Sequence, residues 1–147
     1  MQRRCAVFVQ EQIRFGSQQR VHRINRMIVL RLPEVEGLPP GKHAFHVHAY
    51  GDCSADDGSS AGPHFDFKGS FTQQQADHIA GDLGELSADA GGKAHLEASI
   101  RDATLQGPYS VIGRSIVVHE SPNDTTKPPE GNAGGRVACA VIGIEKR

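Results

Sequence analysis

The sequence lacks tryptophan, contains only 5% aromatic residues and has no long hydrophobic run. No stretch of 18 or more apolar residues occurs, which excludes a transmembrane helix. The net charge of −1 favours no charged partner. The first fifty residues are basic, but their arginines are spread along expected strands without interleaved aromatic residues. We therefore expect no nucleic-acid partner and no membrane partner.

Cysteine is also scarce. Cys5, Cys53 and Cys139 show no Cys-x-x-Cys spacing, which excludes the usual zinc-finger patterns. Polar residues interrupt the opening segment, so no secretory signal is visible and we expect a cytoplasmic location. An extracytoplasmic location stays open if the N-terminus is engineered or processed. A disulfide would be unusual in the cytoplasm, although one pair of cysteines could form one.

The chain has 147 residues, 17 glycines and 8 prolines, and no segment of convincing length has helical periodicity. Two polar stretches, 51–81 and 120–135, are long enough to be functional loops. Short strands separated by turns predict an all-β sandwich or barrel. We expect strands within 5–15, 21–32, a segment that begins at Gly41, 93–100, 111–119 and 136–144.

A His-x-His pattern lies in the segment 41–52. Residues two apart on a strand point the same way, so His46 and His48 would project together, about 6.6 Å apart along the strand. That spacing allows both imidazoles to bind one metal ion, whereas Phe45 and Val47 would face the opposite side. Two histidines on a solvated strand face are the alternative interpretation, and the pattern alone does not exclude it.

Five motifs occur in order along the chain. They are His46-Val47-His48, Gly62-Pro63-His64-Phe65, Gly81-Asp82-Leu83-Gly84, GRSIVVHE from Gly113 to Glu120, and GNAGGRVAC from Gly131 to Cys139. With these motifs the sequence resembles the copper/zinc superoxide dismutases over about residues 37–144. The resemblance implies a single dismutase-like domain over residues 1–147. It also implies a Greek-key β-sandwich or barrel, immunoglobulin-like, with eight strands and two long functional loops.

The resemblance further implies a set of site residues. Nitrogen ligands suit copper, and four histidines match the copper ligands: His46, His48, His64 and His119. His64 also matches the bridging position between copper and zinc, where it would supply a proton. Arg136 matches the arginine that attracts a small anion. Cys53 and Cys139 match the disulfide that this family keeps even in the cytosol, which would resolve the conflict over compartment.

The implied reaction converts two superoxide anions and two protons into dioxygen and hydrogen peroxide by cycling of copper between Cu(II) and Cu(I). A non-enzymatic relative is the alternative, either a copper-binding protein or a domain related to copper chaperones. The resemblance makes superoxide the substrate, allows a copper chaperone as a partner, and favours a homodimer. Its contacts would come from the segments 112–114 and 141–144.

The chain departs from the family pattern in the zinc half. His64, His78 and Asp82 fall at or near zinc positions, but no histidine lies between Phe65 and Asp77. A closed zinc site normally has four protein ligands, so we expect zinc binding to be lost or weakened. Asn123 and Asp124 are the candidates for residues that do not bind the metal themselves but contact the metal-binding side chains and orient them. His43 is expected to hydrogen-bond the backbone instead of a metal.

Overall fold

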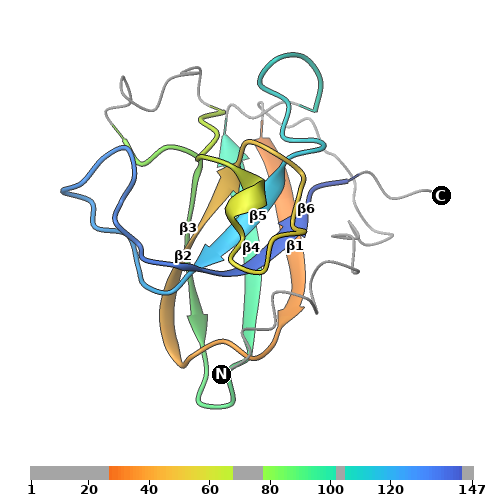
Figure 1. Ribbon diagram of the computed structural model, residues 1–147. Helices are drawn as coiled ribbons and strands as arrows, with labels where there is room; N and C mark the ends of the chain where they lie inside the picture. The colour runs from red at the N-terminus through yellow and green to blue at the C-terminus, as the bar shows by residue number, and fades with distance from the viewer. Residues whose placement is uncertain (1–26, 68–77, 102–104, 144–147) are drawn as a thin grey trace.

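The computed structural model describes residues 27–67, 78–101 and 105–143. These ranges contain antiparallel strands and one short 3₁₀ helix, so the predicted all-β class is confirmed (Figure 1). Six strands are present in the described ranges, and the expectation of eight extends to residues outside them. The elements are β1 (Met27–Val35), β2 (Gly41–His48), η2 (Ser59–Ala61), β3 (Asp82–Ala88), β4 (Ala94–Arg101), β5 (Ser115–His119) and β6 (Arg136–Val141).

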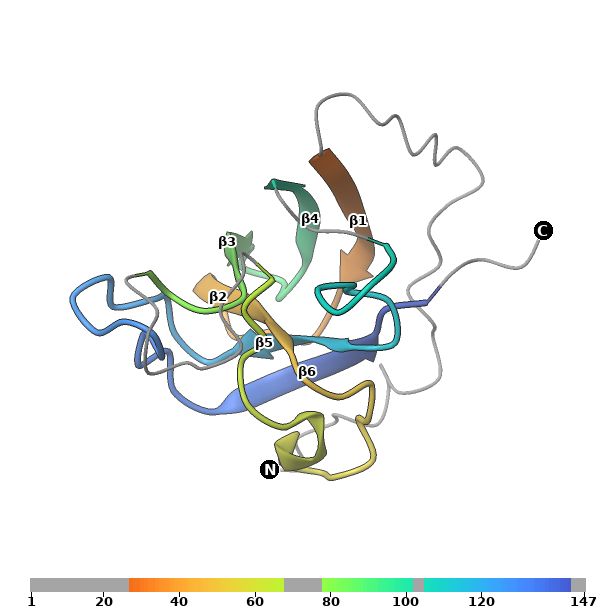
Figure 2. The ribbon, with the colours of Figure 1, turned by 90° about the horizontal axis from the view of Figure 1, so that it is seen from above.

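The described strands form two sheets. One has four strands in the order β3-β2-β5-β6, and the other pairs β1 with β4. Figure 2 shows the β1–β4 pair standing across from β5 and β6. Within the larger sheet, Phe45 lies opposite Val118, and Val47 lies opposite Ile116. This register places alternating apolar side chains of neighbouring strands on the same inner face.

The inner face of the four-stranded sheet makes the main hydrophobic core. Phe45 and Val47 are fully buried there, as their alternation with the histidines predicts. The opposite face of the same strands carries His46, His48 and Cys139. These side chains are also buried, because loops cover this second face. The histidine face is therefore an enclosed layer and not a solvated strand surface.

Strand β3 was not predicted. Its sequence, DLGELSA, is rich in residues that strands disfavour, and only Leu86 and Ala88 within it are buried. The strand forms because the backbone from Asp82 to Ala88 pairs with β2. Long-range pairing therefore overrides local propensity here, which a pattern within the segment does not reveal.

The predicted strand 111–119 starts later, at Ser115. Gly113 has a positive φ of 79°, and Arg114 donates its backbone N–H to the Val111 oxygen at 3.2 Å, which closes a turn. Val111 is nevertheless fully buried and contributes to the core from the loop. Its apolar character reflects core packing and does not mark strand structure.

Backbone hydrogen bonds join the first long loop to β2. The Phe65 N–H donates to the Val47 oxygen at 2.8 Å, and the Val47 N–H donates to the Gly81 oxygen at 2.9 Å. A Cβ at Gly81 would lie 2.5 Å from the Val47 oxygen, and its φ of 68° also favours glycine. The second loop joins the first, since the Ala80 N–H donates to the Pro129 oxygen at 2.9 Å.

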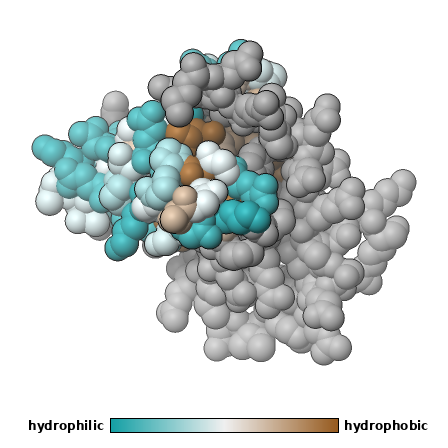
Figure 3. Space-filling view, turned by 90° about the horizontal axis from the view of Figure 1, so that it is seen from below, coloured by the Kyte–Doolittle hydropathy of each residue, from teal (hydrophilic) through white to brown (hydrophobic). Residues whose placement is uncertain are grey.

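The described residues form a mostly hydrophilic surface on the face seen in Figure 3. Among the described residues, Tyr50 is the large hydrophobic residue that is exposed, with 61% of its surface accessible to solvent. No described helix has the length and apolar character that crossing a membrane requires.

Candidate metal centre

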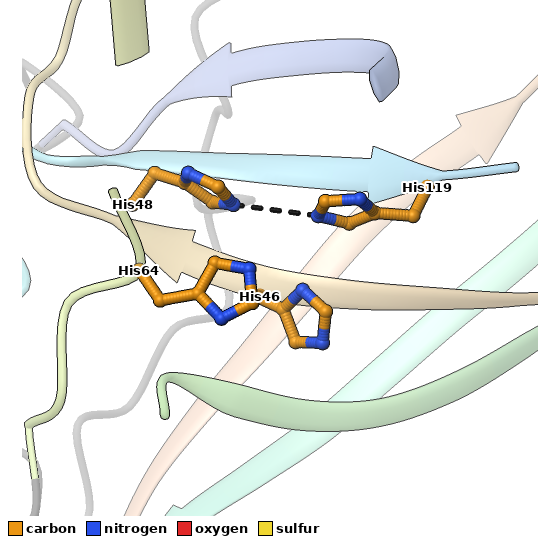
Figure 4. A group of neighbouring side chains, drawn as sticks. All are labelled: His46, His48, His64 and His119. Carbon is orange, nitrogen blue, oxygen red and sulfur yellow. Dashed lines mark hydrogen bonds between the residues drawn. The ribbon is translucent and has the colours of Figure 1, made fainter. Parts of the chain in front are cut away.

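Four histidines from three parts of the chain meet on the covered face of the sheet. They are His46 and His48 on β2, His64 in the first loop, and His119 at the end of β5. Each ring offers one nitrogen as a possible ligand atom, and these four nitrogens all lie within 4.8 Å of one another. All four are buried, and Figure 4 shows the rings turned toward a common space. His64 is held against β2 by an isolated β-bridge with His48. The four predicted copper ligands are thus together.

An oxygen acceptor fixes one nitrogen of three of the rings. His48 donates from Nδ1 to the Gly62 oxygen at 2.8 Å, and His119 donates from Nδ1 to the Gly134 oxygen at 3.1 Å. His46 meets the side-chain oxygen of Asn123 through Nε2 at 2.7 Å. Such partners orient a ligand ring and leave its other nitrogen with a lone pair for a metal.

The nitrogens left over by this arrangement suit a cation. Nε2 of His48 and Nε2 of His119 lie 3.3 Å apart, joined by the dashed line in Figure 4. With both protons on Nδ1, each of these atoms is a lone-pair donor, and one cation can satisfy both. Nδ1 of His46 is buried without a hydrogen-bond partner. A buried set of imidazole donors fits copper, so these four residues would hold that ion.

Burial lowers the pKa of all four histidines. It lowers the pKa of His46, His64 and His119 to about 4, and that of His48 to about 2. Mutual repulsion between the rings adds to this effect, and hydrogen bonds to Asn123, Gly62 and Gly134 oppose it in part. The imidazoles are therefore neutral at pH 7, which is the form that binds metal.

These shifts predict an acid-labile metal-free protein. Between pH 6.5 and 4 the unfolded chain binds more protons than the folded one, because the folded pKa values lie below 6.5. The free energy of unfolding should be at its full value above pH 6.5 and should fall as the pH drops through this window. Urea unfolding of chelator-treated protein at pH 7.5 and 4.5 measures the difference. An unchanged midpoint would contradict the burial of neutral rings.

Arg136 starts β6 and reaches toward the first loop. Its Nη1 donates to the Gly58 oxygen at 2.8 Å, and Gly58 leaves room for it, since a Cβ there would lie 3.0 Å from Cβ of Arg136. The positive charge lowers the pKa of His48, His64 and His119, so it acts on the cluster. The guanidinium therefore places a fixed positive charge beside the four histidines.

A disulfide joins the two elements that hold this arginine. Cys53 in the first loop is bonded to Cys139 in β6, with Cα atoms 5.7 Å apart. Both cysteines are buried in a small cluster with Ala61 and Val117. The bond links positions 86 residues apart and fixes the loop carrying Gly58 against the strand carrying Arg136.

The candidate zinc residues are arranged differently. Among the described residues, the four copper-site histidines are the group whose ligand atoms converge on a metal position. Nε2 of His78 lies 3.0 Å from one carboxylate oxygen of the buried Asp66, and Asp82 accepts hydrogen bonds from Asn123 and from the Gly84 N–H. Within the described ranges, His64, His78 and Asp82 do not bring their ligand atoms together at one metal position.

The two candidates for the supporting layer behave differently from each other. Asn123 contacts both His46 and Asp82, whereas the carboxylate of the half-buried Asp124 accepts hydrogen bonds from the backbone N–H and the hydroxyl of Thr126. His43 contacts the backbone oxygens of His119 and Pro39, each at 2.7 Å, as expected.

Two site features were not predicted. Asp66 pairs with His78, and Glu130 brings a carboxylate oxygen to 3.9 Å from Nε2 of His64. Asp66 between Phe65 and Phe67 offered a signal, because a carboxylate flanked by two core aromatic residues needs a partner. Nothing in the local sequence marks Glu130, since loop packing brings it near the cluster.

Comparison with known proteins agrees with this geometry. The family model described as "Copper/zinc superoxide dismutase (SODC)" matches residues 9–142. A protein named extracellular superoxide dismutase [Cu-Zn], from Brugia pahangi, is 43% identical over 122 residues, which cover 76% of this chain and 61% of the relative. One named superoxide dismutase [Cu-Zn], from Onchocerca volvulus, is 44% identical over 122 residues, which cover 76% of this chain and 77% of the relative. The chain thus belongs to the copper/zinc superoxide dismutase family.

Proposed function

We propose that this protein is a copper-dependent superoxide dismutase. The observation that carries the proposal is the set of four buried, neutral imidazoles beside the positive charge of Arg136. Metal binding needs the neutral rings, and an anionic substrate needs the charge. The reaction consumes two superoxide anions and two protons and yields dioxygen and hydrogen peroxide. Copper, when bound, supplies the one-electron oxidation and reduction.

The residues of this chain have separate roles in the proposal. His46, His48, His64 and His119 hold the ion. Arg136, anchored at the Gly58 oxygen, attracts the anion and orients it by hydrogen bonds. His64 is also the candidate for proton transfer, through one of its ring nitrogens.

A superoxide consumption assay on copper-loaded protein tests the proposal. We expect consumption that is proportional to bound copper and absent from the chelated protein. Tight copper binding without consumption would favour the alternative, a copper-binding or chaperone-related protein that is not an enzyme. A copper chaperone that delivers the ion is compatible with either function.

We further propose that the zinc site is lost or weakened. The support is that Asp66 already engages His78, and Asn123 engages Asp82. Metal analysis after incubation with equimolar copper and zinc should give one copper and much less than one zinc per chain. One stoichiometric zinc in the copper-loaded protein would contradict this proposal.

We also propose one domain, a homodimer and a cytoplasmic location. Support for the dimer comes from the half-buried Ile112 and Val141, whereas Ile142 is fully buried within the chain. Sedimentation equilibrium should give twice the chain mass. The relative named extracellular makes secretion the competing location, and fractionation of the native source distinguishes the two.

A further inference from the structure

Asn123 connects residues of two neighbouring strands. Its side-chain oxygen lies 2.7 Å from Nε2 of His46 on β2, and its side-chain nitrogen lies 3.0 Å from a carboxylate oxygen of Asp82 on β3. His46 and Asp82 are cross-strand partners in the sheet. One amide of the second loop therefore spans a pair of facing side chains at the edge of the histidine cluster.

The chemistry of the three groups determines the direction of the bridge. A carboxylate only accepts hydrogen bonds, so Asp82 must face the NH₂ group of Asn123. The amide oxygen then faces His46, and because that oxygen also only accepts, Nε2 of His46 must carry the proton. The lone pair is left on Nδ1, which is the nitrogen that is buried without a partner.

We propose that Asn123 is a positioning residue that uses Asp82 as its anchor. It fixes the tautomer and the angle of His46 without a zinc ion on that side of the site. This inference rests on the proposed copper-binding role of His46. In this inference Asp82 has a role different from metal ligation. It holds the Asn123 amide in the one orientation that leaves Nδ1 of His46 free to bind the metal.

The identity of residue 123 follows from the same contact. An aspartate there would place a second carboxylate about 3 Å from that of Asp82, where two like charges repel unless a cation or a proton lies between them. The asparagine is neutral and donates to Asp82 while it accepts from His46. Asn123 and Asp82 therefore form a matched pair of one amide and one carboxylate. If the two are swapped, with aspartate at 123 and asparagine at 82, the hydrogen bond between the positions should be kept.

Three variants test the pair: Asn123→Asp, Asp82→Asn and the double exchange. In chelator-treated protein, Asn123→Asp should lower the unfolding midpoint by about 5 °C or more, because it creates the carboxylate pair. The double variant should recover at least half of that loss, since an asparagine at 82 can donate to an aspartate at 123. Recovery of folding counts as the same rescue if Asn123→Asp alone does not fold.

A second readout separates positioning from mere support. The Cu(II) electron paramagnetic resonance spectrum should change in Asn123→Asp and return toward that of the parent protein in the double variant. Asp124→Asn is the control: it replaces a carboxylate by an amide at the next residue, whose side chain contacts Thr126. Its copper spectrum should match that of the parent protein.

Two results would overturn the inference. Additive effects of the two single substitutions on the metal-free midpoint would show that the side chains do not interact. An unchanged copper spectrum in folded Asn123→Asp would show that residue 123 does not position His46. Both readouts are independent of catalysis, so a parent protein without dismutase activity would refute the proposed function and leave the bridge standing.

Discussion

Replacement of His48 by glutamine is expected to lower superoxide consumption per chain by more than about a hundredfold. His48 is fully buried, and it donates from Nδ1 to the Gly62 oxygen while Nε2 faces the other histidines. The glutamine NH₂ group can still donate to the Gly62 oxygen, but the side chain offers no imidazole lone pair at the place of Nε2. The change therefore removes one of the four imidazoles proposed to hold copper. Activity and bound copper, measured on the same sample, should fall together.

His78→Gln is the matched control, because it makes the same exchange at a histidine outside the cluster. Glutamine keeps a donor for the buried carboxylate of Asp66, so the fold should survive. We expect this variant to retain most of its activity and its copper. An equally large loss in His78→Gln would show that the zinc-side residues take part in catalysis and would contradict the separate role given to the four histidines.

Replacement of Arg136 by alanine is expected to lower kcat/KM by about tenfold to a hundredfold at low ionic strength, with copper content unchanged. A charge-assisted hydrogen bond contributes about 1.5–3 kcal/mol, which corresponds to this range. The guanidinium is anchored at the Gly58 oxygen and held by the disulfide that joins its strand to the first loop. Burial lowers the pKa of Arg136 and the carboxylates of Asp57 and Glu130 oppose that shift, so the guanidinium stays charged at neutral pH.

Arg136→Lys is the control for charge alone. Lysine keeps the positive charge but loses the planar set of donors, so its kcat/KM should lie between those of the alanine variant and the parent. Added salt should reduce the difference between the parent and the alanine variant, since screening weakens the attraction of the anion. Equal rates for the parent and the alanine variant at every salt concentration would remove Arg136 from the mechanism.

The copper half of the site was predictable because its residues lie in regular structure or in distinctive motifs. His46 and His48 alternate with Phe45 and Val47, and strand geometry alone places the two pairs on opposite faces. The sequence pattern did not predict that the histidine face is enclosed. Two loops cover that face. The residue pattern of the strand alone would be the same if the face were exposed to solvent.

The supporting layer was predictable in part. Asn123 was a candidate, but its anchor at Asp82 depends on β3, a strand made by pairing with β2 and built from residues of low strand propensity. The Asp66–His78 pair joins residues 12 positions apart in the sequence, which meet only in the folded chain. Contacts that depend on long-range pairing and on loop closure leave little trace in local sequence.

The central claim is that four histidines hold a catalytic copper ion in a site that works without zinc. The most direct test is to titrate copper into zinc-free protein and to measure bound metal and superoxide consumption on each sample. We expect activity to rise in proportion to copper and to level off at one copper per chain, with zinc at background. Activity that stays at background when copper is bound, or that appears only after one zinc per chain is added, would contradict the account.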